Sequence, residues 1–247
     1  MTGVGGRVAV VTGAAGGLGV SICQRLHRDG FRVVLADRMP TDDLAAALGA
    51  ERALSVTVDV TRRDQVEALL ATVEGHWGGV DILINNAGRT RVGPFVSSPE
   101  AHWDELLEVD VKGVLRCSQV VLPGMLARRW GRIVNMASDA ARTGLPGQTV
   151  YAAAKGAVIA FTRSLAREVG ERNVLVNAVS PGPVNTPPLQ RLFERQPELA
   201  QQLRAEIPLG EVADVADVSG AVAFLVSEDA RYITGQVLSV NGGWVTA

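Results

Sequence analysis

The sequence predicts an α/β protein: a single domain over residues 1–247, built as a Rossmann-like, doubly wound parallel sheet of about seven strands with helices on both faces. Two observations predict this fold class. Short apolar, β-branched runs alternate with segments of helical period along the whole chain, as right-handed crossovers between parallel strands require. The runs at residues 8–11 and 82–84 are apolar throughout, which is typical of a sheet buried on both sides.

Each element follows from its own pattern. Runs rich in Val, Ile and Ala that end at polar or glycine-rich turns predict strands at Arg7–Thr12, Phe31–Asp37, Ala53–Asp59, Val80–Asn85, Gly131–Ala137, Val174–Ser180 and Gln236–Val240. Apolar residues at three- and four-residue spacing predict helices at Gly17–Asp29, Arg62–His76, Pro99–Arg129, Val150–Val169 and Asp214–Val226.

One segment breaks this alternation. Pro181–Gly210 is rich in Pro, Gln, Arg and Glu and lies between a strand and the last long helix. A connection of this length is usually functional, so we expect a surface excursion or a lid, with a substrate loop at about residues 187–210.

Composition and charge exclude several classes of protein. A hydrophobic content of 47% excludes a disordered chain, and a net charge of −2 predicts no nucleic-acid partner. No apolar stretch is long enough to cross a membrane, so no membrane partner is expected. Two cysteines and a start without a signal-peptide pattern predict a cytoplasmic protein. His27, His76 and His102 are scattered, which predicts no metal site.

A glycine-rich turn follows the first predicted strand and opens the first helix. Glycines there permit a tight turn and let backbone N–H groups approach a pyrophosphate, although glycines can also serve close packing alone. Asp37 ends the second strand eighteen residues after Gly19, where a carboxylate can accept hydrogen bonds from ribose hydroxyls and would repel a 2′-phosphate. The cofactor predicted is therefore NAD, while Arg38 leaves NADP open because Arg can bind that phosphate.

A rare pair of residues predicts acid–base chemistry. The chain has two Tyr and two Lys, and Lys155 stands four residues after Tyr151 on a predicted helix, so both lie on one helix face. A phenol is a poor base near neutrality, but a nearby cation favours the phenolate. Tyr151 is then a candidate general base for alcohol oxidation and general acid for ketone reduction. The alternative is a pair on the helix surface without chemistry.

These motifs together resemble the short-chain dehydrogenase/reductase family over the whole chain. The resemblance rests on Thr12-Gly13-x-x-x-Gly17-x-Gly19, Asn85-Asn86-Ala87-Gly88, Tyr151-x-x-x-Lys155, Pro181-Gly182 and Asn241-Gly242-Gly243. It implies that Ser138 holds the substrate oxygen and that Lys155 also holds the nicotinamide ribose. It further implies a homotetramer and cofactor contacts from Gly13, Gly17, Leu18, Gly19, Asp37, Asp59, Val60, Asn86, Gly88, Tyr151, Lys155, Pro181, Val184 and Thr186.

One residue departs from the family pattern. The run Val109-Asp110-Val111-Lys112-Gly113 carries Asp110 where the family usually has Asn. Asp offers similar acceptor geometry but has no amide donors and adds a negative charge. We expect Asp110 to keep the structural role of this catalytic position, protonated or paired, and Asp110→Asn to change activity by less than severalfold.

The predicted reaction is NAD-dependent hydride transfer between a secondary alcohol and a ketone, on a small-molecule substrate. The run Ala137-Ser138-Asp139-Ala140-Ala141-Arg142 resembles dehydrogenases of 3-hydroxyacyl-CoA esters, including alicyclic ones. Two alternatives are an NADP-dependent 3-oxoacyl-carrier-protein reductase-like ketoreductase and a non-catalytic nucleotide-binding regulatory protein. Substrate choice is expected to depend on residues 139–148 and 187–210, because loops carry specificity on this fold.

Overall fold

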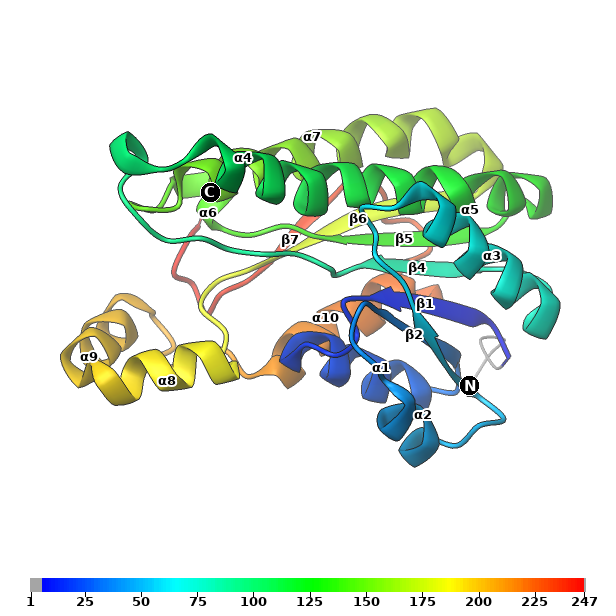
Figure 1. Ribbon diagram of the computed structural model, residues 1–247, viewed down its shortest axis with the longest axis horizontal. Coiled ribbons are helices and arrows are strands. Elements are labelled where there is room, and N and C mark those ends of the chain that lie inside the picture. The colour runs from blue at the N-terminus through cyan, green and yellow to red at the C-terminus, as the bar shows by residue number, and fades with distance from the viewer. Residues whose placement is uncertain (1–5, 247) are drawn as a thin grey trace.

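Seven parallel strands form one sheet in a computed structural model that describes residues 6–246. Their order is β3-β2-β1-β4-β5-β6-β7, so the chain winds outward in one direction from β1 and then in the other from β4. This confirms the predicted fold class (Figure 1). The strands are β1 Val8–Thr12, β2 Arg32–Asp37, β3 Ala53–Thr57, β4 Ile82–Asn85, β5 Gly131–Met136, β6 Val174–Pro181 and β7 Val237–Val240.

Helices cover both faces of the sheet, as predicted (Figure 1). One face carries α1 (Gly17–Arg28), α2 (Asp42–Leu48) and α10 (Val215–Val226), whose apolar residues pack with the sheet in one core. The other face carries α3 (Arg63–Trp77), α5 (Val114–Arg128) and α7 (Thr149–Val169) over a second core. Burial of both faces explains why residues 8–11 of β1 and 82–84 of β4 are apolar throughout.

The predicted helix Pro99–Arg129 is wrong in one respect, because it is not continuous. It consists of α4 (Glu100–Leu107), a π-helical turn η2 (Glu108–Gly113) and α5. The π turn carries Asp110, which is completely buried. Such wide turns are often found at functional sites, and here the turn places Asp110 beside Lys155 of α7.

The segment at residues 181–210 also differs from the loop that was predicted. It folds into α8 (Pro187–Arg195) and α9 (Pro197–Glu206), a pair of short helices that projects from the body of the molecule (Figure 1). Each helix begins with a proline, whose fixed φ suits the first helical position and whose missing N–H costs nothing there. The remaining short elements are η1 Phe95–Ser97, α6 Ala140–Thr143, η3 Gly170–Arg172 and η4 Glu228–Ala230.

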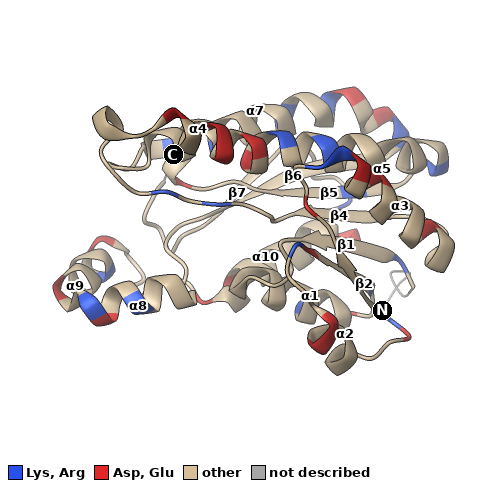
Figure 2. Ribbon diagram, in the orientation of Figure 1, with Lys and Arg blue, Asp and Glu red and all other residues tan. Residues whose placement is uncertain are grey.

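The topology indicates that a ligand would bind at the carboxyl ends of the strands, which we call the carboxyl edge of the sheet. The winding direction reverses between β1 and β4, and in open α/β sheets ligands bind outside the carboxyl ends of the strands at such a switch point. The projecting helix α9 carries charges of both signs (Figure 2). Among residues 6–246, none of the helices combines the length and apolar character that a bilayer crossing requires.

Candidate active site

The turn between β1 and α1 accepts only glycine at two positions. Gly13 has φ +68°, and a Cβ there would lie 2.7 Å from the Cα of Ala87. A Cβ on Gly19 would overlap the carbonyl oxygen of Gly13. No side chain caps the start of α1, so its first N–H groups remain available at the turn. Free N–H groups and the positive end of the helix dipole suit a pyrophosphate.

Thr12 and Asn86 hold this turn against β4. The Thr12 hydroxyl accepts hydrogen bonds from the N–H groups of Asn86 and Ala87, both at 3.1 Å. The Asn86 side-chain amide donates to the carbonyl oxygens of Thr12 at 2.9 Å and Gly13 at 3.0 Å. Asn86 was predicted to contact the cofactor, but its amide donors are committed to the loop that would carry the cofactor.

Asp37 lies at the end of β2 and is held in place by two backbone groups. Its Oδ2 accepts a hydrogen bond from Ala15 N, and its Oδ1 accepts one from Met39 N, both at 2.9 Å. The first bond ties the carboxylate to the glycine-rich turn. Each oxygen keeps a lone pair, so the fixed carboxylate can still accept hydrogen bonds from a ribose.

A cavity of about 330 Å³ brings several predicted cofactor residues together. Asp59 is ionised in its wall: burial opposes its charge, but hydrogen bonds from Thr61 and the charges of Arg38 and Arg62 hold its pKa below the ordinary value. The polar groups of its lining suit the adenosine end of a dinucleotide. The predicted residues in the lining are Gly13, Asp37, Asp59, Val60 and Gly88, joined by Arg38 and Thr61.

Lys155 and Asp110 form a buried ion pair at the carboxyl edge of the sheet. Lys155 Nζ lies 2.9 Å from Asp110 Oδ1, and the two side chains are 5% and 0% exposed. The angles at this contact are not those of a hydrogen bond, so the attraction is between charges. Asp110 Oδ2 accepts a hydrogen bond from Arg89 N at 3.0 Å. A Cβ on Gly88 would come within 2.8 Å of Asp110 Oδ1, which explains the glycine.

Tyr151 and Ser138 lie next to this pair. Lys155 Nζ is 5.7 Å from the centre of the Tyr151 ring and donates a hydrogen bond at 3.0 Å to the carbonyl of Met136, the last residue of β5. Ser138 follows that strand by two residues, and its hydroxyl accepts a hydrogen bond from Ala140 N at 3.2 Å. The predicted Tyr–Lys pair therefore occupies one face of α7 and contacts the strand that leads to Ser138.

The segment after β6 lies beside the glycine-rich turn. Val184 forms a β-bridge with Ala213, and Thr186 precedes the first turn of α8. The Cδ of Pro187 lies 3.2 Å from where a Cβ on Gly17 would stand. The predicted residues Pro181, Val184 and Thr186 thus belong to a segment that reaches from β6 to the glycine-rich turn.

Two residues that support the site were not among the predicted catalytic or cofactor residues. The Arg89 N–H fixes Asp110, and Asp139, directly after Ser138, is a completely buried acid. A charged residue next to a predicted catalytic serine was a signal for Asp139, whereas nothing in the sequence indicated Arg89.

Among residues 6–246, no three His, Cys, Asp or Glu side chains are grouped as metal ligands. Both cysteines, Cys23 and Cys117, are free and buried.

The arrangement defines a class of protein. Three features are those expected of a nicotinamide-dependent alcohol/ketone oxidoreductase: a glycine turn at a helix start, an acid at the end of β2 that is tied to this turn, and a buried Lys beside a Tyr at the carboxyl ends of the strands.

Comparisons with known proteins agree with this class. A family model described as enoyl-(acyl carrier protein) reductase matches residues 13–245. The chain is 42% identical to nodulation protein G of Rhizobium sp. (strain N33), over 96% of both chains. It is 39% identical to 3-oxoacyl-[acyl-carrier-protein] reductase of Vibrio cholerae, over 96% of this chain and 97% of that one. A solved short-chain dehydrogenase/reductase of Brucella melitensis, described as glucose/ribitol dehydrogenase, superimposes with a TM-score of 0.91 at 32% identity over 98% of each chain. The chain belongs to the short-chain dehydrogenase/reductase family, as the motifs predicted.

Proposed function

We propose that this protein reduces 3-oxoacyl thioesters to 3-hydroxyacyl thioesters with a nicotinamide cofactor. The observation that carries the proposal is the Tyr151–Lys155–Asp110 arrangement at the carboxyl edge of the sheet. The substrate class is supported by relatives from Vibrio cholerae and Thermotoga maritima, both named 3-oxoacyl-[acyl-carrier-protein] reductase, which match over 96–97% of this chain. These relatives favour the ketoreductase alternative over the 3-hydroxyacyl-CoA dehydrogenase that the sequence first suggested.

Each residue has a distinct part in the reaction. The Ser138 hydroxyl donates a hydrogen bond to the oxo group and stabilises the charge that develops on its oxygen. The Tyr151 hydroxyl gives its proton to that oxygen, and the ammonium of Lys155 stabilises the phenolate left behind. Asp110 and the Met136 carbonyl hold Lys155 in place. The cofactor, when bound, supplies the hydride to the carbonyl carbon.

A substrate panel tests this proposal. Purified protein is mixed with reduced cofactor and, in separate assays, acetoacetyl-CoA, crotonyl-CoA and simple ketones, while the absorbance of the reduced cofactor is followed. We expect acetoacetyl-CoA to be consumed fastest. Faster consumption of crotonyl-CoA would overturn the proposal in favour of enoyl reduction, the reaction named by the family model. Cofactor binding without turnover of any substrate would favour the non-catalytic, nucleotide-binding alternative.

We also propose that NAD(H) is preferred over NADP(H). The Asp37 carboxylate is fixed by Ala15 N and Met39 N beside the cavity, where it would repel a 2′-phosphate. Arg38 lines the same cavity and would act in the opposite direction. We expect a higher kcat/KM for NADH than for NADPH, and we expect Asp37→Ser to move the ratio toward NADPH by about tenfold or more. An unchanged ratio would contradict the assignment.

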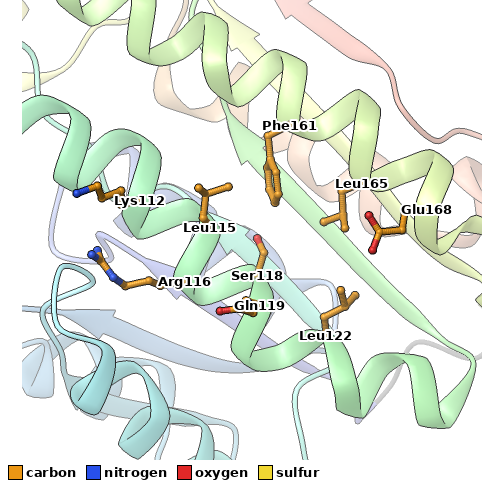
Figure 3. A pocket seen from close by; sticks show the side chains of 9 residues that line it. All are labelled: Lys112, Leu115, Arg116, Ser118, Gln119, Leu122, Phe161, Leu165 and Glu168. Atoms are coloured by element: carbon orange, nitrogen blue, oxygen red, sulfur yellow. The ribbon is translucent and has the colours of Figure 1, made fainter.

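A homotetramer is the proposed assembly. A groove of about 500 Å³ runs between α5 and α7, and Leu115, Leu122, Phe161 and Leu165 form its apolar lining (Figure 3). Lys112 and Arg116 lie at one end of the groove and Glu168 at the other. A second copy related by a twofold axis would set each basic end against an acidic end, which supports a symmetric contact.

The remaining predictions concern the whole chain. We propose that residues 1–247 act as one domain and that α8 and α9 form its substrate lid. The lid role is supported by the exposure of α8, which buries none of its residues, and by the position of Pro187 next to Gly17 of the glycine-rich turn.

A cytoplasmic location is also proposed, and it is supported by two cysteines that remain free thiols.

A further inference from the structure

Asp139 is a completely buried acid that the proposed chemistry does not use. It follows Ser138 directly and is 0% exposed. Its Oδ1 accepts hydrogen bonds from the hydroxyls of Ser180 at 2.7 Å and Ser239 at 3.1 Å, and its Oδ2 accepts one from the Asn241 amide. None of these partners is charged. Acids are almost never fully buried without compensation, so the three donors must stabilise the carboxylate.

A positive charge is linked to Asp139 through a hydroxyl. Arg142, in α6, donates a hydrogen bond to Ser239 Oγ. Ser239 in turn gives its proton to Asp139, so donors and acceptors alternate from guanidinium to hydroxyl to carboxylate. Both Asp139 and Arg142 belong to the run from Ala137 to Arg142 that the sequence singled out. Its two charged residues are thus the ends of one hydrogen-bonded chain.

The three donors come from two segments beside the site. Ser180 is near the end of β6, just before the Pro181–Gly182 segment. Ser239 lies on β7, and Asn241 follows that strand. A Cβ on Gly182 would be only 2.8 Å from the Cβ of Asn241, so the two segments are in close contact. Asp139 therefore joins the ends of β5, β6 and β7.

The network also reaches the base of the proposed lid. Gly242, next to Asn241, accepts a hydrogen bond from Leu209 N at 3.1 Å. Trp244 Nε1 donates to Glu206 Oε2, in the last turn of α9, at 3.2 Å. The end of the α8–α9 pair is thus attached to the same segment that donates to Asp139.

We propose that Asp139 is a positioning residue, whose carboxylate fixes the Ser138 loop, the Pro181–Gly182 segment and the base of α9 relative to one another. This rests on the proposed role of Ser138 in holding the substrate oxygen. Asparagine at this position keeps the size of the side chain. Its amide N–H groups, however, would face groups that donate hydrogen bonds to the Asp139 carboxylate. The loops then lose their common anchor, and a misplaced Ser138 slows the chemical step more than it weakens substrate binding.

The test compares Asp139→Asn with a matched control. Asn177→Ala removes another buried polar side chain from β6, one that bonds the Ile233 carbonyl and Gln236 N away from the site. We expect Asp139→Asn to lower kcat by about tenfold to a hundredfold with a smaller change in KM. Asn177→Ala is expected to lower the thermal unfolding temperature while kcat stays within about twofold. A kcat for Asp139→Asn within twofold of the unchanged protein overturns the proposal.

A second measurement does not depend on turnover. Hydrogen–deuterium exchange of the protein without cofactor is expected to rise in Asp139→Asn at residues 138–143 and 181–186. A rise spread evenly over the sheet, as in the Asn177→Ala control, overturns the proposal. If the unchanged protein consumes no 3-oxoacyl thioester, the proposed function fails, but this exchange comparison still decides the role of Asp139.

Ser239→Ala covers the case in which Asp139→Asn does not fold. It removes one donor to Asp139 and the bridge to Arg142, and it leaves Ser180 and Asn241 in place. We expect kcat to fall about three- to tenfold, the equivalent of one hydrogen bond. An unchanged kcat in a folded Ser239→Ala variant overturns the proposal.

Discussion

At the scale of single residues, the site depends on how one ammonium group is held. Lys155 is 4% exposed, and its Nζ is shared between the Met136 carbonyl and the Asp110 carboxylate. A buried ammonium without a partner would be strongly disfavoured. Asp110 supplies the missing charge from a π turn, and Gly88 leaves the space for both groups.

The first prediction concerns the proton donor. Tyr151→Phe removes the hydroxyl and keeps the ring, so we expect kcat for acetoacetyl-CoA reduction to fall by about 10²–10⁴-fold, the usual contribution of a general acid. Binding of NADH, followed by its fluorescence, is expected to persist. Tyr232→Phe is the matched control because Tyr232 is the other tyrosine and is 98% exposed. Equal activities of the two variants would show that Tyr151 is not the acid.

The second prediction concerns Asp110, which stands where the family usually has Asn. Asp110→Asn keeps an acceptor for Arg89 N but removes the charge opposite Lys155. We expect the free energy of unfolding, measured in urea, to fall by about 3–5 kcal/mol, the usual cost of removing one charge of a buried ion pair. Activity is expected to stay within severalfold, because the amide still fixes the π turn.

A double-mutant cycle provides the control for Asp110. In a Lys155→Met background the carboxylate has lost its counter-ion, so Asp110→Asn should cost less there or stabilise the protein. Equal costs in the two backgrounds would mean that the contact between Asp110 and Lys155 adds nothing to stability.

At the scale of elements, the turn between β1 and α1 is the least tolerant part of the fold. Gly19→Ala would drive a methyl group into the Gly13 carbonyl, so we expect a loss of about 1–3 kcal/mol in unfolding free energy, typical of overpacking. We also expect at least tenfold weaker NADH binding, because the turn proposed to receive the pyrophosphate must move. Calorimetry and fluorescence titration measure the two effects.

Gly75→Ala is the matched control for this turn. Gly75 lies within α3, and a Cβ there meets nothing within 4 Å. Alanine is the better helix former, so this change is expected to stabilise the protein by up to about 1 kcal/mol and to leave NADH binding unaltered. Comparable losses in both variants would indicate a general intolerance of alanine rather than a specific collision.

The elements differ in how well the sequence predicts them. All seven predicted strands agree with the structure within about two residues at each end, because uninterrupted apolar runs leave few alternatives. The π turn at Glu108–Gly113 was not predictable, since one extra residue in a turn barely disturbs a three- and four-residue spacing. Pro187 and Pro197 are typical of the first position of a helix and could have predicted the starts of α8 and α9. The prediction of a loop relied instead on the polar, proline-rich composition of the segment.

The residues of the candidate site also differ in how well the sequence predicts them. The glycine turn, Asp37 and the Tyr151–Lys155 pair lie within short motifs, and local spacing was enough to propose them. The partners of Asp139 lie 41 to 102 positions further along the chain, so only the folded sheet brings them together. Asp110 was recognised as a departure, but its pairing with Lys155 depends on the packing of α7 against the π turn.

At the scale of the whole molecule, two cores of similar extent stabilise the two faces of the sheet. Each core contains one cysteine, Cys23 or Cys117, and burial raises the pKa of both thiols to about 12. The thiolate is therefore disfavoured in the folded protein, although it forms readily in the unfolded chain. The free energy of unfolding is therefore expected to fall as the pH rises from 9.0, the ordinary pKa of a cysteine thiol, toward about 12, its pKa in the folded protein.

Thiol reactivity then reports on global unfolding. At pH 8 we expect neither cysteine to react with a chromogenic disulfide reagent, because the thiolate is the reactive form. In urea above the unfolding midpoint both are expected to react. Rapid reaction of one thiol in the native protein would show that its core opens locally.

The proposed assembly gives the last prediction. A charge at Phe161, in the groove between α5 and α7, should prevent a second copy from covering it. We expect Phe161→Asp to lower the molar mass, measured by light scattering after size exclusion, below that of four chains. Leu209→Asp is the control, since Leu209 is 78% exposed and lies outside the groove. An unchanged mass for Phe161→Asp would rule out this face as a contact.

The long sequence separation within the Asp139 network has a consequence for synthesis. Ser239 is 100 residues further along the chain than Asp139, which corresponds to about 5–20 s of translation at typical rates. The first four strands, with the glycine turn and Asp37, have left the ribosome before that interval begins. A nascent chain can thus form the half proposed to bind the nucleotide while the loop with Ser138 still lacks its anchor, so this half precedes the one that holds the proposed catalytic residues.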